Sequence, residues 1–137
     1  MSDSSPLYDL GMQTRRKILG ERHVDAVQAN ITPFNDAFQT LITETAWGRV
    51  WSRETISLRE RSMLTIALLA AFGHYEELAM HVRATHNTGA SLDDIKEALL
   101  HVAIYAGVPA ANHAFKVVAN AYDEMSRSDV SKEDHHA

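Results

Sequence analysis

The sequence contains no cysteine, and this absence excludes several kinds of chemistry. A chain without thiols cannot form disulfides, use a cysteine nucleophile or cycle a dithiol pair. It fits a reducing compartment, so we expect a cytoplasmic protein. The first residues, Met1 to Pro6, include neither a basic start nor an apolar stretch, and we expect no secretory signal.

Long apolar runs and an excess of positive charge are also missing. The longest apolar run, Met63 to Phe72, is interrupted by Thr65 and is far shorter than the roughly 20 residues that cross a bilayer. The net charge is −5, whereas proteins that bind nucleic acid usually gather a basic surface. Neither a Gly-x-Gly-x-x-Gly fingerprint nor a phosphate loop is present. We therefore expect binding to neither a membrane nor a nucleic acid.

Helical periodicity is the main structural signal, and there is little room for strands. Apolar residues recur at helical spacing in about seven segments, separated by glycines and by prolines that favour helix starts. Capping patterns at Thr32-Pro33, at Ser57 with Glu60, and at Ser91 with Asp94 predict three helix starts. The sequence thus predicts an all-α, single-domain bundle over residues 1–125, followed by a disordered polar tail over 126–137.

Two residues of one predicted helix suggest acid and base chemistry. Glu77 and His81 are four positions apart, so their side chains lie over one another on a helix surface, at the edge of its buried face. One interpretation is an exposed pair that contributes only a few tenths of a kcal/mol. The other is a catalytic pair in a pocket, which also requires a source of positive charge for an acidic substrate.

Arginines and tryptophans between positions 47 and 61 could supply that positive charge and an apolar wall. Trp47, Arg49, Trp51 and Arg53 alternate around a predicted helix break, and Arg59 and Arg61 follow. Guanidinium groups match the geometry of carboxylates, so the cluster predicts an anion site. The alternative is solvated surface charge beside structural tryptophans.

A metal site is a further alternative, because the chain has eight histidines. His74, Glu77 and His81 could face one ion on a helix. Their spacing differs from the His-Glu-x-x-His pattern of zinc helices, and the sequence offers no further well-placed ligand beyond these three. We expect no metal and no other cofactor.

Motifs spread over most of the chain resemble those of the carboxymuconolactone decarboxylase family. They are Trp47-Gly-Arg-Val-Trp51, Arg61-Ser-Met-Leu-Thr65, Glu77-Leu-Ala-Met-His81, Asn87-Thr-Gly89 and Tyr105-Ala-Gly-Val-Pro-Ala-Ala-Asn112. The resemblance implies an alkylhydroperoxidase D-like helical fold that assembles into a ring, commonly a hexamer. It also implies cofactor-independent decarboxylation of 4-carboxymuconolactone to the β-ketoadipate enol-lactone, in the protocatechuate branch of aromatic degradation.

The resemblance also implies roles for the candidate residues. His81 is expected to be the general acid that Glu77 holds and tunes, while Arg61 or Arg49 binds a substrate carboxylate. The expected pocket also includes Trp47, Trp51 and His74. His74 and the following Tyr75 depart from the family pattern, and this departure could alter the substrate preference. Related alkylhydroperoxidases have two cysteines at the positions of His74 and Glu77, so peroxidase chemistry cannot transfer. A related enzyme for another small acid or lactone, or a non-catalytic oligomeric binding protein, remains an alternative.

Overall fold

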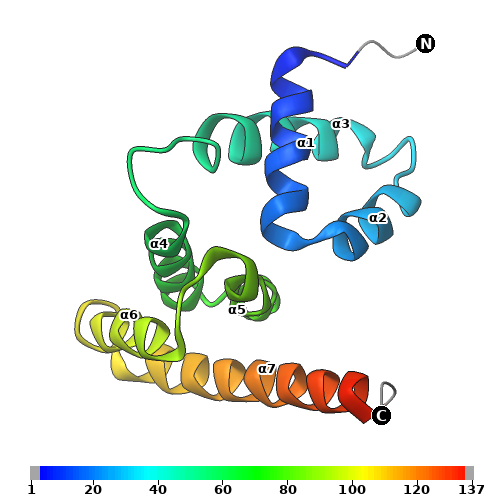
Figure 1. The fold of residues 1–137 in the computed structure, drawn as a ribbon. Coiled ribbons are helices and arrows are strands. Elements are labelled where there is room, and N and C mark those ends of the chain that lie inside the picture. Colours follow the sequence, from blue (N-terminus) through cyan, green and yellow to red (C-terminus); the bar gives the residue numbers. More distant parts are fainter. Residues whose placement is uncertain (1–3, 135–137) are drawn as a thin grey trace. The chain divides into compact units, whose positions relative to one another are not determined.

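The computed structural model describes residues 4–134, which form helices and connecting turns without any strand (Figure 1). This confirms the predicted all-α class. The α-helices are α1 (Pro6–Leu19), α2 (Glu21–Ala29), α3 (Asp36–Ile42), α4 (Leu58–Phe72), α5 (Tyr75–Thr88), α6 (Leu92–Tyr105) and α7 (Val108–Asp134), and a π-helix, η1 (Thr43–Val50), continues α3. None of the helices in this part of the chain is both long and apolar enough to cross a bilayer.

The helices form two compact units, Met1–Leu58 and Arg59–Ala137. The single domain expected over residues 1–125 stays a prediction. The helix α7 continues to Asp134, past the point where the sequence predicts the tail to begin, and residues 135–137 of that tail lie outside the described residues.

The first unit depends on a close crossing of α1 and η1. Gly11 of α1 is buried against the backbone of η1, and a β-carbon at this position would overlap the carbonyl group of Thr43. On the other side of the crossing, a β-carbon on Gly48 would lie 2.9 Å from the carbonyl oxygen of Leu7. Only glycine leaves enough space for two helix backbones to approach this closely.

Polar side chains hold the same crossing in place. The buried Arg15 guanidinium donates hydrogen bonds from Nη1 to Gln39 Oε1 at 3.1 Å and to Thr43 Oγ1 at 3.2 Å. Burial lowers the pKa of Arg15, while the Coulombic interaction with Tyr8 opposes that shift. The guanidinium still remains protonated at neutral pH because its ordinary pKa is so high.

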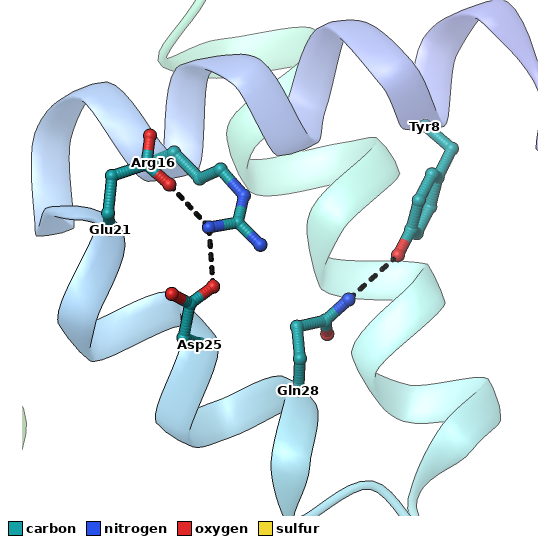
Figure 2. A network of polar contacts seen from close by, with 5 residues as sticks. All are labelled: Tyr8, Arg16, Glu21, Asp25 and Gln28. Atoms are coloured by element: carbon teal, nitrogen blue, oxygen red, sulfur yellow. Dashed lines mark hydrogen bonds and ion pairs between the residues drawn. The ribbon is translucent and has the colours of Figure 1, made fainter.

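The next residue, Arg16, joins α1 to α2 (Figure 2). Its Nη1 atom contacts Glu21 Oε2 and lies 2.8 Å from Asp25 Oδ1. Hydrogen bonds with Asp25 and then Glu21 raise the pKa of Arg16. Figure 2 also shows Gln28 of α2 donating to the Tyr8 hydroxyl at 3.5 Å. The turn at Gly20 between the two helices is therefore closed by side chains on both of them.

The second unit has a continuous apolar core. Its members are contributed by α4, α5, α6 and α7: Ile66, Ala70, Leu78, Val82, Ile95, Leu99, Val102, Ala111, Ala114, Val118 and Ala121. Complete burial of an aliphatic side chain such as Leu99 contributes roughly 1.5–3 kcal/mol. Phe115 of α7 is 38% exposed although it keeps the apolar periodicity of that helix. The neighbouring Ala114 is fully buried instead, because α7 presents its small residues to the core.

Two of the three predicted helix starts agree with the structure. Ser91 and Asp94 form a complete capping box, in which the Asp94 amide donates to Ser91 Oγ at 3.0 Å. The helix α4 begins at Leu58, directly after Ser57. The start predicted at Thr32 is wrong by three residues, because a turn precedes α3 and the Asn35 side chain accepts the Thr32 amide at 2.8 Å.

Replacement of Gly11 by alanine tests the helix crossing. Alanine is favoured over glycine inside a helix by about 1 kcal/mol, so helix propensity alone predicts a more stable protein. Overlap with the Thr43 carbonyl should outweigh this gain, since overpacking costs roughly 1–3 kcal/mol or more. We expect Gly11→Ala to lower the free energy of unfolding in urea. A stabilised variant would show that the backbones are not in contact.

Asp94 provides a test at acid pH, because Arg59 binds it through two hydrogen bonds of 2.7 and 2.8 Å. These bonds, followed by the Ser91 amide, hold the pKa of Asp94 well below its usual range. A lowered pKa stabilises the fold above the unfolded value of about 3.9, and this stabilisation disappears as the pH falls through the folded value.

We therefore expect Asp94→Asn to lower the unfolding temperature at pH 7 and to approach the wild type below about pH 4. Asparagine can still accept the Ser91 amide, so the comparison isolates the charge. Asp93→Asn is the matched control, since Asp93 pairs with the exposed Lys96 at 3.3 Å. An Asp94→Asn curve that stays parallel to the wild-type curve at every pH would contradict the assignment.

Candidate active site

The candidate site residues of the first unit are positioned by the π-helix. Its wider turn is seen at Trp51, whose amide donates to the Ala46 carbonyl five residues earlier at 2.9 Å. Trp47 and Trp51 are both buried, and their ring centroids lie 5.3 Å apart at an interplanar angle of 33°. π-Helical turns are rare and often occur at functional sites. The structure therefore brings the two predicted tryptophans together.

Trp51 lines a cavity of about 450 Å³ in the same unit. The cavity lies between one face of α1 and the segment that leaves η1, and its lining residues are Leu10, Gln13, Thr14, Lys17, Ile18, Trp51, Ser52, Arg53, Glu54, Ile56, Ser57 and Leu58. Its size is within the range of small-molecule sites, roughly 300–1,000 Å³. Neither Trp47 nor the exposed Arg49 is among the residues that line it.

The candidate acid and base residues are on α5 in the second unit. His81 is 7% exposed, and its Nδ1 atom is shielded from solvent. Leu78 and Val82, which flank it on the helix, are completely buried in the core. Glu77, one turn earlier, is exposed. The spacing therefore gives one buried imidazole and one carboxylate at the surface, and the tuning role of Glu77 stays a prediction.

His74 occupies the position that precedes α5. It is exposed, and its ring lies 6.2 Å from the ring of Phe72. Across residues 4–134, the structure contains no group of three His, Asp or Glu side chains arranged to hold a metal ion. The geometry thus gives no support to the alternative in which His74, Glu77 and His81 share an ion.

The arginines at the start of α4 differ in what they contact. The Arg59 guanidinium donates two hydrogen bonds to the Asp94 carboxylate. This member of the predicted arginine cluster therefore has an acidic partner within its own unit. Arg61 is half-buried. The next residue, Ser62, donates to Thr88 Oγ1 at 2.6 Å, which sets the register of α4 against α5. Thr88 is seven residues from His81, which corresponds to about 10 Å along α5.

The predicted residues thus fall into two groups. Trp47, Arg49 and Trp51 belong to the first unit, and Arg61, His74, Glu77 and His81 belong to the second. The hypothesis that all seven line one pocket stays a prediction. The prediction did not include Lys17 among the lining residues of the first unit's cavity. In the sequence, Lys17 is recognisable only as a basic residue beside the apolar stripe of the first helix. This pattern does not predict which segment packs across that helix.

Comparisons with known proteins identify the family. A model of the carboxymuconolactone decarboxylase family matches residues 36–120. A 4-carboxymuconolactone decarboxylase from Acinetobacter baylyi is 42% identical over 118 residues, which cover 86% of this chain and 88% of that protein. This chain belongs to the carboxymuconolactone decarboxylase family.

Two other relatives indicate the range of this similarity. A nitrosuccinic acid decarboxylase from Metarhizium robertsii is 38% identical over 119 residues, or 87% of this chain and 83% of that protein. A 4-carboxymuconolactone decarboxylase from Pseudomonas putida is 46% identical over 46 residues, which cover 34% of this chain and 96% of that sequence. The relatives therefore include decarboxylases that are named for two different acids.

Proposed function

We propose that this protein is a decarboxylase that converts 4-carboxymuconolactone to the β-ketoadipate enol-lactone and CO2. The observation that supports this most strongly is 42% identity to a decarboxylase of that name over nearly the full length of both chains. The buried imidazole of His81, at the end of the Glu77-Leu-Ala-Met-His81 motif, provides a proton donor for the reaction. The proposal places the reaction in the cytoplasm and in the protocatechuate branch of the β-ketoadipate pathway.

The substrate supplies its own electron sink. When the bond between the ring and the leaving carboxylate breaks, its electron pair moves through the ring double bond to the lactone carbonyl oxygen and forms a dienolate. A proton then adds to the ring carbon beside that carbonyl, and the double bond shifts to give the enol-lactone. Neither a metal nor an organic cofactor is needed for this sequence. The site needs a proton donor, a cation for the retained carboxylate and an apolar wall.

The candidate residues match these needs. His81 delivers the proton, because imidazole can both hold and release one near neutral pH. Glu77 orients it, and Arg61 or Arg49 binds the retained carboxylate. Trp47 and Trp51 give the wall beside the leaving group, and His74 completes the substrate-binding set.

Nitrosuccinic acid is the second candidate substrate, because a relative named for it matches 87% of this chain. By its name, this acid has a nitro group that can accept the electrons left behind by CO2. Both candidate acids thus combine a carboxylate to be lost with an electron-accepting group. A comparison of turnover on the two acids distinguishes them, and turnover of neither would favour a non-catalytic binding protein.

The proposal includes a ring of identical subunits, which we expect to be a hexamer. Leu64, Leu68 and Phe72 follow one another at four-residue spacing along α4 and are 58%, 57% and 71% exposed. Ile104 and Tyr105 at the end of α6 are 76% and 85% exposed. Apolar surface of this extent is typical of protein interfaces, so a second copy of the chain is the proposed occupant.

Replacement of His81 tests the catalytic role. If His81 delivers the proton, His81→Ala should lower kcat by ~100-fold to ~10,000-fold, the usual range for a positioned acid or base. Glu77→Gln should lower it less, because the imidazole is still present. Turnover is measured from the loss of lactone absorbance together with the release of CO2.

His86→Ala is the matched control, since His86 is an exposed histidine on the same helix and should keep full activity. All three variants should elute with the wild-type oligomer, so that lost activity is not lost assembly. A fully active His81→Ala enzyme would assign the proton to another group. A wild-type chain that elutes at its single-chain mass of 15.3 kDa would contradict the ring.

A further inference from the structure

The cavity of the first unit has the composition of a binding site for a small organic acid. Lys17 contributes a cation from α1, and Arg53 contributes a second one from the segment after η1. Glu54 is the single acidic residue of the lining, so positive charge prevails there although the chain as a whole is acidic. The apolar part of the lining includes the indole of Trp51, on which a flat, unsaturated body can lie.

Three consecutive basic residues on α1 show why Lys17 differs from its neighbours. Each step along a helix turns the side chain by about 100°, so Arg15, Arg16 and Lys17 point in three directions. Arg15 is buried and binds Gln39 and Thr43. Arg16 binds Glu21 and Asp25 (Figure 2). Among the described side chains, Lys17 forms no ion pair, and it is the member of the triplet that lines the cavity.

Two of the three hydroxyl groups of the lining already donate to backbone carbonyls. Thr14 Oγ1 donates to the Leu10 carbonyl at 2.9 Å, and Ser52 Oγ donates to the Gly48 carbonyl at 2.5 Å. Their protons are thus bound to the helix backbone, and they can only accept further hydrogen bonds. A carboxylate needs donors, and the charged donors of this cavity are the Lys17 ammonium and the Arg53 guanidinium.

We propose that this cavity binds a small unsaturated dicarboxylate through one of its carboxylates, which Lys17 and Arg53 share, while Trp51 contacts the carbon skeleton. The identity of the ligand as substrate rests on the proposed function, whereas binding itself does not. Lys17 lies outside residues 36–120, to which the family model is matched, whereas Trp51 and Arg53 lie within them.

Tryptophan fluorescence reports directly on this cavity. The chain has two tryptophans, Trp47 and Trp51, and both belong to the first unit. The probe is mesaconate, a small unsaturated dicarboxylate, and its uncharged dimethyl ester is the ligand control. We expect mesaconate to change the emission of the full-length protein in a saturable way. The ester should not, because it lacks the charges that Lys17 and Arg53 bind.

Variants then test the two cations. Lys17→Gln and Arg53→Gln should each raise the Kd for mesaconate by ~10-fold to ~100-fold, as expected for the loss of one charge-assisted hydrogen bond. Lys17→Arg keeps the charge and should retain most of the affinity. Lys96→Gln, on the exposed face of α6, is the matched control and should bind like the wild type. Thermal unfolding of each variant shows that it is folded.

The results separate this inference from the proposed function. A saturable response that depends on Lys17, together with a raised KM for 4-carboxymuconolactone in Lys17→Gln, supports both. A response that depends on Lys17 in a protein without decarboxylase activity supports the site and rejects the function. If the protein turns over 4-carboxymuconolactone but Lys17→Gln changes neither the KM nor the Kd for mesaconate, the site is rejected and the proposed function is retained. No saturable response in the wild type also overturns the site.

Discussion

The close contact between α1 and η1 is the constraint on which the first unit depends. Gly11 and Gly48 have no β-carbons, so the two backbones can approach very closely. A β-carbon at either position would lie too close to a carbonyl group of the other helix. That approach lets Arg15 reach Gln39 and Thr43. It also fixes η1, whose π-turn brings Trp47 and Trp51 together at 5.3 Å and starts the segment that closes the cavity over α1. A larger residue at either glycine would separate all of these groups.

The second unit buries an imidazole beside its apolar core. His81 lies between core residues on α5, and the hydrogen bond from Ser62 to Thr88 aligns α4 beside it. Two polar anchors, this hydroxyl pair and the Arg59–Asp94 ion pair, are both at the start of α4. The charge of Arg59 is bound by Asp94, which removes this arginine from the predicted anion site.

Local signals in the sequence predicted much of this fold. Helix ends followed from caps and glycines, and the Ser91–Asp94 box formed as expected because its partners are only three residues apart. The π-helix was not predicted, since a change from four-residue to five-residue hydrogen bonds leaves no distinct pattern of residues. The start of α3 was misplaced because the Asn35 side chain caps a turn at Thr32. The family was predicted correctly from motifs that extend over most of the chain.

Contacts between distant parts of the chain were beyond such reasoning. The sequence placed Arg59 in an anion-binding cluster, but its partner, Asp94, is 35 residues away. Likewise, Lys17 and Trp51 share a cavity only because α1 and η1 cross. Burial also separated the members of the predicted acid-base pair, since a one-turn spacing does not determine how far each side chain lies inside the fold. His81 is buried and Glu77 is exposed.

The central claim is that His81 protonates the carbon beside the lactone carbonyl after CO2 has left. A single turnover of 4-carboxymuconolactone in D2O, quenched early and analysed by proton NMR with a chiral shift reagent, tests it most directly. The chiral reagent is needed because the two methylene hydrogens of the achiral product are enantiotopic. The account predicts one CO2 per substrate and one deuterium in the methylene group beside the carbonyl, in a single configuration. The trace product of His81→Ala should contain both configurations. Deuterium in both configurations from the wild-type enzyme, or a single configuration from His81→Ala, would contradict protonation by this residue.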